Sequence, residues 1–280
     1  MDNTTEEKIK DLLSGFMKNL IKKRTVLQPF NPLEIENVNP FGFRLAPIEI
    51  WKGSKFERSF VTALGQKVFE KLAKIVAEGT GAFAQNQYDT EITINSYRAE
   101  KIDEILKMQR GAQKKRQNKA KTNTIQENFQ YAPNWNKELN EILSLHNQKF
   151  ETLRVRFDLY IKRTNASEEF YSIKTVKPNL DQTEIAKRDM LRIKSVNENI
   201  DTYFALPYNP AGEGENYKKV HSIPYRIFNM DEDKCVLIGS TFWNKVGQDE
   251  NTYNDLLRIF KEIGKTYEPI IKKDYLGINS

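Results

Sequence analysis

The sequence has little of what several large enzyme classes require. Its 280 residues include one cysteine, Cys235, and two histidines, His146 and His221. An internal disulfide, a multi-thiolate zinc site and a three-histidine metal centre are therefore excluded. No G-x-S-x-G, G-x-G-x-x-G or G-x-x-x-x-G-K-[ST] pattern occurs, which argues against serine hydrolases with that elbow and against the common nucleotide-binding loops.

Long apolar runs are also absent. No window approaches the roughly 18–20 consecutive apolar residues that a membrane-spanning helix needs. The first seven residues, MDNTTEE, lack the basic start and apolar stretch of a signal peptide. We therefore expect a cytoplasmic protein without a membrane partner.

Positive charge is concentrated in one part of the chain. The formal net charge is +6, and residues 98–127 carry nine basic and four acidic side chains, which is nearly the whole excess. From Lys107 to Lys121 there are seven basic residues and no acidic one. Such a run is typical of contacts with nucleic-acid phosphates, although a solvated helix face has the same composition.

The hydrophobic pattern predicts one domain of mixed α/β class over residues 1–280, with a helical N-terminal half. Helical spacing of apolar residues is found in 5–23, 56–78, 98–118, 136–149, 181–195 and 251–264, and strands are predicted at 153–161, 168–176, 202–206 and 235–238. Residues 28–48, rich in proline and asparagine, are expected to be irregular. Within this domain we distinguish an N-terminal extension, 1–50, and a basic helical segment, 98–150.

Two predicted neighbouring strands bring polar groups together. Asp158 lies on the face opposite the apolar row of its strand, and Ser172 and Lys174 share one face of the next strand. Carboxylate oxygens bind hard cations such as Mg²⁺, and a nearby lysine can position an attacking water and stabilise developing negative charge. This outline, a carboxylate followed by x-x-Lys on a hairpin partner, is that of a PD-(D/E)XK nuclease, although an ordinary surface hairpin also produces it.

Longer sequence blocks resemble restriction enzymes. SFVTALGQKVFE, residues 59–70, resembles the S-L-x-T-x-x-G-x-x-x-E helix of many type II restriction endonucleases. IKTVKPN, residues 173–179, is similar to the I-K-T-x-K-P-N segment of the TdeIII-like family, as are ALPYNP (205–210), Phe242-Trp243 and YNDLL (253–257). The order and spacing of these blocks match that family from about Phe56 to Tyr275.

This resemblance implies a restriction-endonuclease-like core, a mixed β-sheet flanked by helices. It also implies a Mg²⁺-dependent, sequence-specific endonuclease that cuts double-stranded DNA within a restriction-modification system. Asp158 would be a metal ligand and Lys174 the catalytic lysine. Glu70 would lie on the helix that closes the metal site.

The family pattern has an acidic residue two positions before the lysine, where this chain has Ser172. Some restriction enzymes that read CCGG cores also have S-x-K and recruit a carboxylate from the following helix. That helix offers Asp181, Glu184 and Asp189, of which we favour Glu184 as catalytic residue and metal ligand and then Asp189. The alternatives are that Glu70 completes the site or that catalysis is weakened.

DNA contacts are predicted from two groups of residues. Lys187, Arg188, Asp189 and Arg192 follow the catalytic strand and are candidates for base contacts, whereas Lys114, Lys115, Arg116, Lys119 and Lys121 are candidates for backbone contacts. A palindromic site is most simply cut by a two-fold symmetric homodimer, with a tetramer as the alternative. The resemblance suggests GGNCC, and the S-x-K pattern suggests a site that contains CCGG.

Two other functions fit the same sequence. One is a DNA-binding or repair-type nuclease on the same fold, whose cleavage is altered by Ser172. The other is a non-catalytic nucleic-acid-binding module that uses residues 98–121, for which Asp158 and Lys174 would be dispensable.

Overall fold

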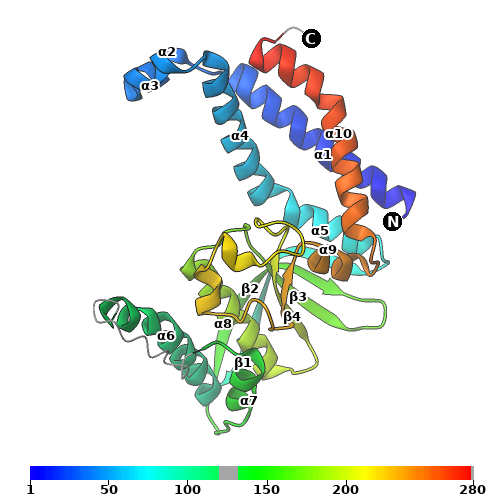
Figure 1. The fold of residues 1–280 in the computed structure, drawn as a ribbon. Helices are drawn as coiled ribbons and strands as arrows, with labels where there is room; N and C mark the ends of the chain where they lie inside the picture. The colour runs from blue at the N-terminus through cyan, green and yellow to red at the C-terminus, as the bar shows by residue number, and fades with distance from the viewer. Residues whose placement is uncertain (120–131, 279–280) are drawn as a thin grey trace.

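The centre of the molecule is a mixed β-sheet (Figure 1). The computed structural model describes residues 1–119 and 132–278, and within these ranges five strands pair in the order β1-β2-β3-β4-β5. The strands are β1 (Phe83–Asn95), β2 (Phe150–Lys162), β3 (Glu168–Ile173), β4 (Asp201–Leu206) and β5 (Val236–Ile238). The first three strands are antiparallel, and β4 and β5 continue the sheet in parallel.

Helices cover both faces of this sheet. One hydrophobic core lies between the sheet and α6 (Ser96–Lys119), α7 (Trp135–Leu143) and α8 (Leu180–Val196). The other lies against α5 (Phe69–Glu78) and α9 (Ser240–Gly247), with the near ends of α1 (Asn3–Lys22) and α10 (Thr252–Ile270). The predicted α/β class, a mixed sheet flanked by helices with a helical N-terminal region, is confirmed.

Three long helices leave the sheet together and form an arm (Figure 1). They are α1, α4 (Ile48–Lys67) and α10. The far end of the arm carries the π-helical turns η1 (Lys23–Leu27) and η5 (Ile271–Leu276) and the short helices α2 (Pro32–Val38) and α3 (Pro40–Leu45). In the described ranges, no helix combines the length and the apolar character needed to cross a membrane.

Several predictions about single elements were wrong. Residues 28–48 are helical over α2 and α3, because Asn31 and Asn39 cap these helices and each begins at a proline, whose fixed φ suits a first helical position. The predicted helix 56–78 is two helices that meet at Val68, since α4 follows the arm while α5 packs on the sheet. Strand β1 and helix α9 were not predicted.

The hairpin β1–β2 changes face halfway along its length. Val155 and Phe157 pack in the core beneath α8, whereas Leu159 and Ile161 pack in the core beneath α5. The apolar residues that were predicted to form one row on β2 therefore pack in two different cores. The change occurs at Asp158 and Gln87, which face each other at the one position where the register between the two strands is not paired, and Gln87 has a φ of 50°. A positive φ is uncommon for a residue other than glycine, and such local irregularities are frequent beside functional sites.

A buried ion pair fixes the turn between β2 and β3. Arg163 Nη2 lies 2.6 Å from Glu169 Oε2, and Tyr171 donates its hydroxyl to the same oxygen at 2.8 Å. Arg163 also donates to the carbonyl of Val246 at 2.9 Å. Because the charges and the remaining donors are satisfied, this network can be buried, and it anchors the hairpin to α9.

Candidate active site

Asp158 and Lys174 meet where strands β2 and β3 diverge. The ladder between these strands runs from Lys162 and Glu168 to Leu159 and Tyr171 and stops there. Lys174 Nζ lies 2.6 Å from Asp158 Oδ2, and both side chains are largely shielded from solvent. Partial burial strengthens this charged contact, because the local dielectric is lower than that of water. The structure thus brings together the two residues that the sequence pattern paired.

Glu70 approaches this pair from the opposite helix. It is the second residue of α5, and its Oε2 accepts a hydrogen bond of 2.6 Å from Gln87 Nε2. Burial raises the pKa of the Glu70 carboxyl, the hydrogen bond from Gln87 opposes this, and the charges of Asp158 and Lys174 raise and lower it respectively. Glu70 therefore lies within electrostatic reach of both other groups.

Asn86 and Gln87 are residues of this site that were not predicted from the sequence. Asn86 Nδ2 donates to the backbone carbonyl of Glu70 at 2.8 Å and to that of Asp158 at 3.3 Å. The two amides therefore connect α5 to β2 at the point where the hairpin changes face. The available signal was a pair of adjacent amide side chains in the middle of a segment that lacks strand periodicity.

Ser172 occupies an interior position of β3. It is almost fully buried and pairs with Phe204 of β4. A buried hydroxyl has no negative charge to offer to a cation, so any further carboxylate has to come from another element.

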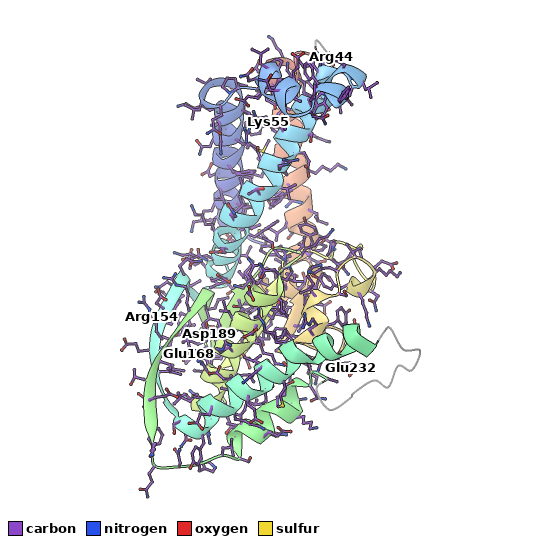
Figure 2. All side chains as sticks on the ribbon, turned by 90° about the vertical axis from the view of Figure 1, so that its left-hand side faces the viewer. Arg44, Lys55, Arg154, Glu168, Asp189 and Glu232 are labelled. Atoms are coloured by element: carbon purple, nitrogen blue, oxygen red, sulfur yellow. The ribbon has the colours of Figure 1, made fainter. Side chains whose placement is uncertain are left out.

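Asp189 is a buried acidic residue of α8 whose pKa is affected by the charge of Lys174. Burial raises the pKa of the Asp189 carboxyl, and the backbone N–H of Arg156 and the charges of Arg192, Arg188 and Lys174 oppose this. Its side chain lies between the helix and the sheet (Figure 2), and Arg192 Nη1 is 3.7 Å away.

Glu184 and Asp181 are held elsewhere. Glu184 accepts from Arg110 and from Arg188, each at 2.6 Å, and Arg110 also lies 2.6 Å from exposed Asp181. The two ion pairs of Arg110 link α6 to α8. The carboxylate first favoured from the sequence, Glu184, is therefore engaged by two arginines, whereas the charge of Lys174 lowers the pKa of Asp189.

The residues described here contain no ready-made metal site. Over 1–119 and 132–278, no three histidine, cysteine or acidic side chains are grouped closely enough to hold an ion. However, Mg²⁺ usually takes only one or two carboxylates from a protein and keeps water and substrate phosphates as its other ligands. The oxygen donors of Asp158 and Glu70, with Asp189 near Lys174, fit this requirement.

The candidate DNA-binding residues fall into different environments. Arg188 is partly exposed and pairs with Asp103 at 2.9 Å, and Arg192 is largely buried beside Asp189. Lys114, Lys115, Arg116 and Lys119 belong to α6, in agreement with a basic helix. Lys121 lies outside the described residues.

The prediction that Lys187 contacts DNA was wrong. Its side chain is fully buried, with Nζ 2.5 Å from Glu138 and hydrogen-bonded to the carbonyl of Ile227. Its ammonium also lies 5.3 Å from the centre of the Phe228 ring. Lys187 therefore joins α8 to α7 within the core.

Replacing Lys187 with methionine is expected to lower the free energy of unfolding by about 3 kcal/mol, because Glu138 would be left as an unpaired buried charge. Urea denaturation measures this loss, and fluorescence anisotropy with a DNA duplex should show unchanged affinity at a temperature where the variant is folded. Lys194→Met on the same helix is the control and should change stability by no more than about 0.5 kcal/mol. Full stability combined with weakened DNA binding would contradict the buried role.

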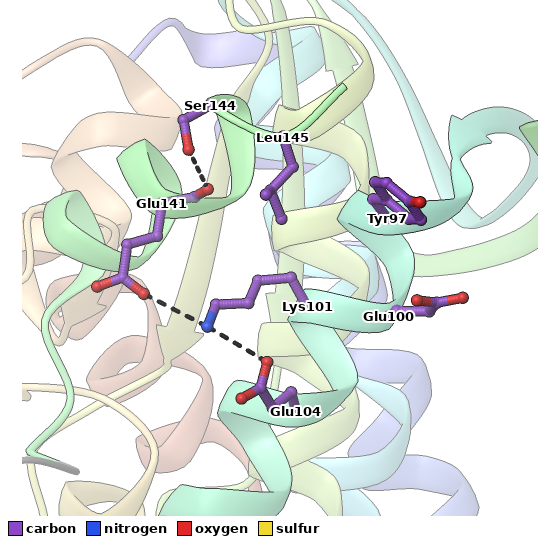
Figure 3. Close-up of a pocket in the computed structure, with 7 residues that line it drawn as sticks. All are labelled: Tyr97, Glu100, Lys101, Glu104, Glu141, Ser144 and Leu145. Carbon is purple, nitrogen blue, oxygen red and sulfur yellow. Dashed lines mark hydrogen bonds and ion pairs between the residues drawn. The ribbon is translucent and has the colours of Figure 1, made fainter. Parts of the chain in front are cut away.

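A surface hollow between α6 and α7 is not the active site (Figure 3). Lys101 lies in it, 3.3 Å from Glu104 and 3.8 Å from Glu141. None of the predicted catalytic residues lines this hollow. Its three glutamates make it unsuited to phosphate groups.

Comparisons with known proteins show which families the chain resembles. The family model of the type II restriction endonuclease HinfI matches residues 4–264. The chain is 28% identical to the type II restriction enzymes HgiEI and HgiBI of Herpetosiphon aurantiacus, over 93% of both chains in each case. It is also 28% identical to HgiCII of the same organism, over 97% of this chain and 98% of the relative.

Proposed function

We propose that this chain cuts DNA with a PD-(D/E)XK active site built on Asp158 and Lys174. The premise is that the chain belongs to the HinfI family of type II restriction endonucleases, which are site-specific deoxyribonucleases. The observation that carries this proposal is the 2.6 Å contact between these side chains at the divergence of β2 and β3. The approach of Glu70 to the same point supports it.

We expect Asp158 and Glu70 to hold a divalent cation, for which Mg²⁺ is the natural candidate. When bound, Mg²⁺ neutralises charge on the scissile phosphate and lowers the pKa of a bound water. Lys174, held against Asp158, is placed to donate a hydrogen bond to the attacking water and to stabilise negative charge as it develops. Gln87 keeps the Glu70 carboxylate in a fixed orientation through its 2.6 Å hydrogen bond.

The S-x-K arrangement, with Ser172 in place of an acidic residue, belongs to the same proposal. We propose that Asp189 supplies the missing carboxylate, in preference to Glu184. The effect of Lys174 on the Asp189 carboxyl supports this choice, and so do the two arginines that engage Glu184.

For DNA recognition we propose a short GC-rich palindrome, GGNCC as in the TdeIII-like resemblance or a site that contains CCGG. Arg188 and Arg192 are the remaining candidates for base contacts, since arginine pairs most often with guanine. Lys114, Lys115, Arg116, Lys119 and Lys121 would contact the phosphate backbone. Two copies related by two-fold symmetry would each cut one strand. A single domain over 1–280 that acts on DNA in the cytoplasm completes the proposal.

A second candidate is a DNA-binding or repair-type nuclease on the same fold. The buried hydroxyl of Ser172 favours it, because a site with one carboxylate fewer on the catalytic strand has less charge with which to hold a cation.

Digestion of a fully sequenced, unmethylated phage DNA tests the proposal. We expect discrete fragments with millimolar Mg²⁺ and intact DNA when EDTA removes the metal, because the cation neutralises charge at the phosphate. Sequencing of the fragment ends then gives the recognition site. Intact DNA in Mg²⁺ together with a gel shift would favour the binding protein, and a smear of fragments would favour a repair-type nuclease.

A further inference from the structure

The linking segment, residues 174–179, joins strand β3 to helix α8 and carries the proposed catalytic lysine. It has no regular structure of its own, because β3 ends at Ile173 and α8 begins at Leu180. The backbone N–H of Lys174 donates to the carbonyl of Ala205 in β4 at 2.9 Å. The 2.6 Å contact between Lys174 Nζ and Asp158 Oδ2 therefore depends on how the rest of the segment is held.

Two side chains from one turn of the loop after β4 bind this segment. Tyr217 begins the 3₁₀ turn η3 (Tyr217–Lys219) and donates its hydroxyl to the carbonyl of Val176 at 2.8 Å. The backbone N–H of His221 bonds to the carbonyl of Tyr217, so that His221 lies one turn further on. Its Nε2 lies 2.8 Å from the carbonyl of Pro178. Because a carbonyl oxygen only accepts hydrogen bonds, this nitrogen carries the proton.

Tyr217 is buried although the loop around it is exposed. Only 3% of its surface is accessible, whereas residues 212–216 and 218–220 are exposed. Its ring packs in the core beneath α8, where a phenylalanine would fill the same space. The hydroxyl is therefore needed for the bond to the linking segment and not for packing. Burial raises the pKa of the Tyr217 hydroxyl above its usual value, which keeps the donor proton in place at neutral pH.

The loop that carries Tyr217 and His221 is itself fixed to the core. Ile227 and Phe228, further along this loop, are fully buried in the same core as Tyr217. Lys187 of α8 donates to the carbonyl of Ile227. The Tyr217 ring meets the His221 ring edge to face, with the ring centres 6.0 Å apart. Because packing and hydrogen bonds lock these side chains, they can restrict the segment that they bind.

Both ends of the linking segment lead to the proposed active site. Lys174 lies at one end, and at the other end Asn179 caps α8 through a capping box with Gln182. The same helix carries Asp189. A catalytic group has to be held within about 0.5 Å of its productive position. A displacement of about 1 Å can lower a rate on the order of 100-fold.

We propose that Tyr217 and His221 are positioning residues that hold Lys174 in place for cleavage. They act through the backbone carbonyls that they bind, and not by contact with DNA or with a cation. The inference rests on the proposed function, because it concerns the catalytic lysine of that site. A merely structural role would change stability alone, whereas a positioning role changes the rate of the chemical step and requires the lysine to be present.

Single-turnover cleavage by Tyr217→Phe tests this proposal, because the variant keeps the buried ring and loses only the hydroxyl. At saturating DNA and Mg²⁺ we expect its rate to fall roughly 30-fold, while DNA affinity measured by a gel shift in Ca²⁺ stays unchanged. Tyr267→Phe is the matched control, since Tyr267 is 5% exposed and donates its hydroxyl to the carbonyl of Ser14 in the arm at 3.2 Å. It should cleave at the parent rate. Circular dichroism checks that both variants are folded.

A pair of variants at His221 tests the second hydrogen bond. His221→Leu removes the donor and should lower the rate roughly 10-fold. His221→Gln keeps an N–H donor at a similar distance from the backbone and should restore most of the rate. Equal rates in the two variants would contradict a role for this bond.

The combination with Lys174→Ala separates positioning from structure. In that background Tyr217→Phe should lower the residual rate by less than about two-fold, because no lysine remains to be positioned. A loss as large as in the parent background would overturn the proposal, and so would a parent rate in Tyr217→Phe alone. The proposed function fails by different readouts: a parent protein that gives no Mg²⁺-dependent fragments, or Lys174→Ala that cleaves at the parent rate. The two failures are therefore distinguishable.

Discussion

Asp158→Ala is expected to reduce the rate of DNA cleavage about 1,000-fold or more, with little loss of fold. The side chain projects from β2 and belongs to neither hydrophobic core, so its removal affects the site and leaves both cores unchanged. Loss of the carboxylate removes a ligand of the proposed cation and the partner of Lys174. Electrostatic and metal contributions of this kind are worth several kcal/mol at the transition state.

Single-turnover cleavage of a duplex that contains the recognition site measures this effect, and a gel shift in Ca²⁺ reports binding separately. Asp89→Ala is the matched control. Asp89 lies on the same hairpin and forms ion pairs with Arg154 and Arg156, but it has no contact with Lys174. Loss of cleavage in both variants would mean that any disturbance of the β1–β2 hairpin abolishes cleavage, and that the effect is not specific to Asp158. Retained cleavage in Asp158→Ala would contradict the assignment of the active site.

The same cleavage assay tests the role of Lys174. We expect Lys174→Ala to lower the cleavage rate to a similar extent, whereas Lys177→Ala, three residues further along and exposed, should cleave normally. Non-additive effects in the double variant of Asp158 and Lys174 would indicate that the two residues act as a unit.

The sequence predicted strands β2 and β3 better than their surroundings. The strict alternation around Asp158 and the turn after Arg163 are local signals, and both survive in the structure. Strand β1 has a polar centre, from Gln85 to Asp89, because it lies at the edge of the sheet, and it therefore lacks the alternation by which strands are found. The partner strand of the active site was missed for this reason.

Tertiary contacts determine the environment of Lys187 and the break between α4 and α5, and the sequence pattern does not contain these contacts. A lysine that follows a catalytic strand is typical of DNA contacts, but Lys187 finds Glu138 within the core, 49 positions away in the chain. In the same way, the apolar stripe of 56–78 continues through Val68, although α4 and α5 pack against different partners. Periodicity records which residues are apolar and does not record which surface each of them meets.

The proposal that Asp189, and not Glu184, supplies the missing carboxylate predicts a large effect on the cleavage rate. Asp189→Asn is expected to lower the cleavage rate about 100-fold, because the amide keeps the shape of the side chain but removes a charge near Lys174. Glu184→Gln is the matched change on the same helix. It weakens ion pairs with Arg110 and Arg188 and should alter stability while the rate at saturating Mg²⁺ stays within a few-fold of the parent rate.

Cleavage rates at increasing Mg²⁺ concentration separate the two roles. A metal ligand lost at Asp189 raises the Mg²⁺ concentration needed for half-maximal rate, whereas a purely structural loss lowers the fraction of active protein at every concentration. The opposite pattern, with a Mg²⁺ defect in Glu184→Gln and a normal Asp189→Asn, would require the ion pairs of Glu184 to break when DNA binds. Arg110 and Arg188 would then be released toward the phosphates as the carboxylate turns to the metal, and the link between α6 and α8 would be part of the catalytic cycle.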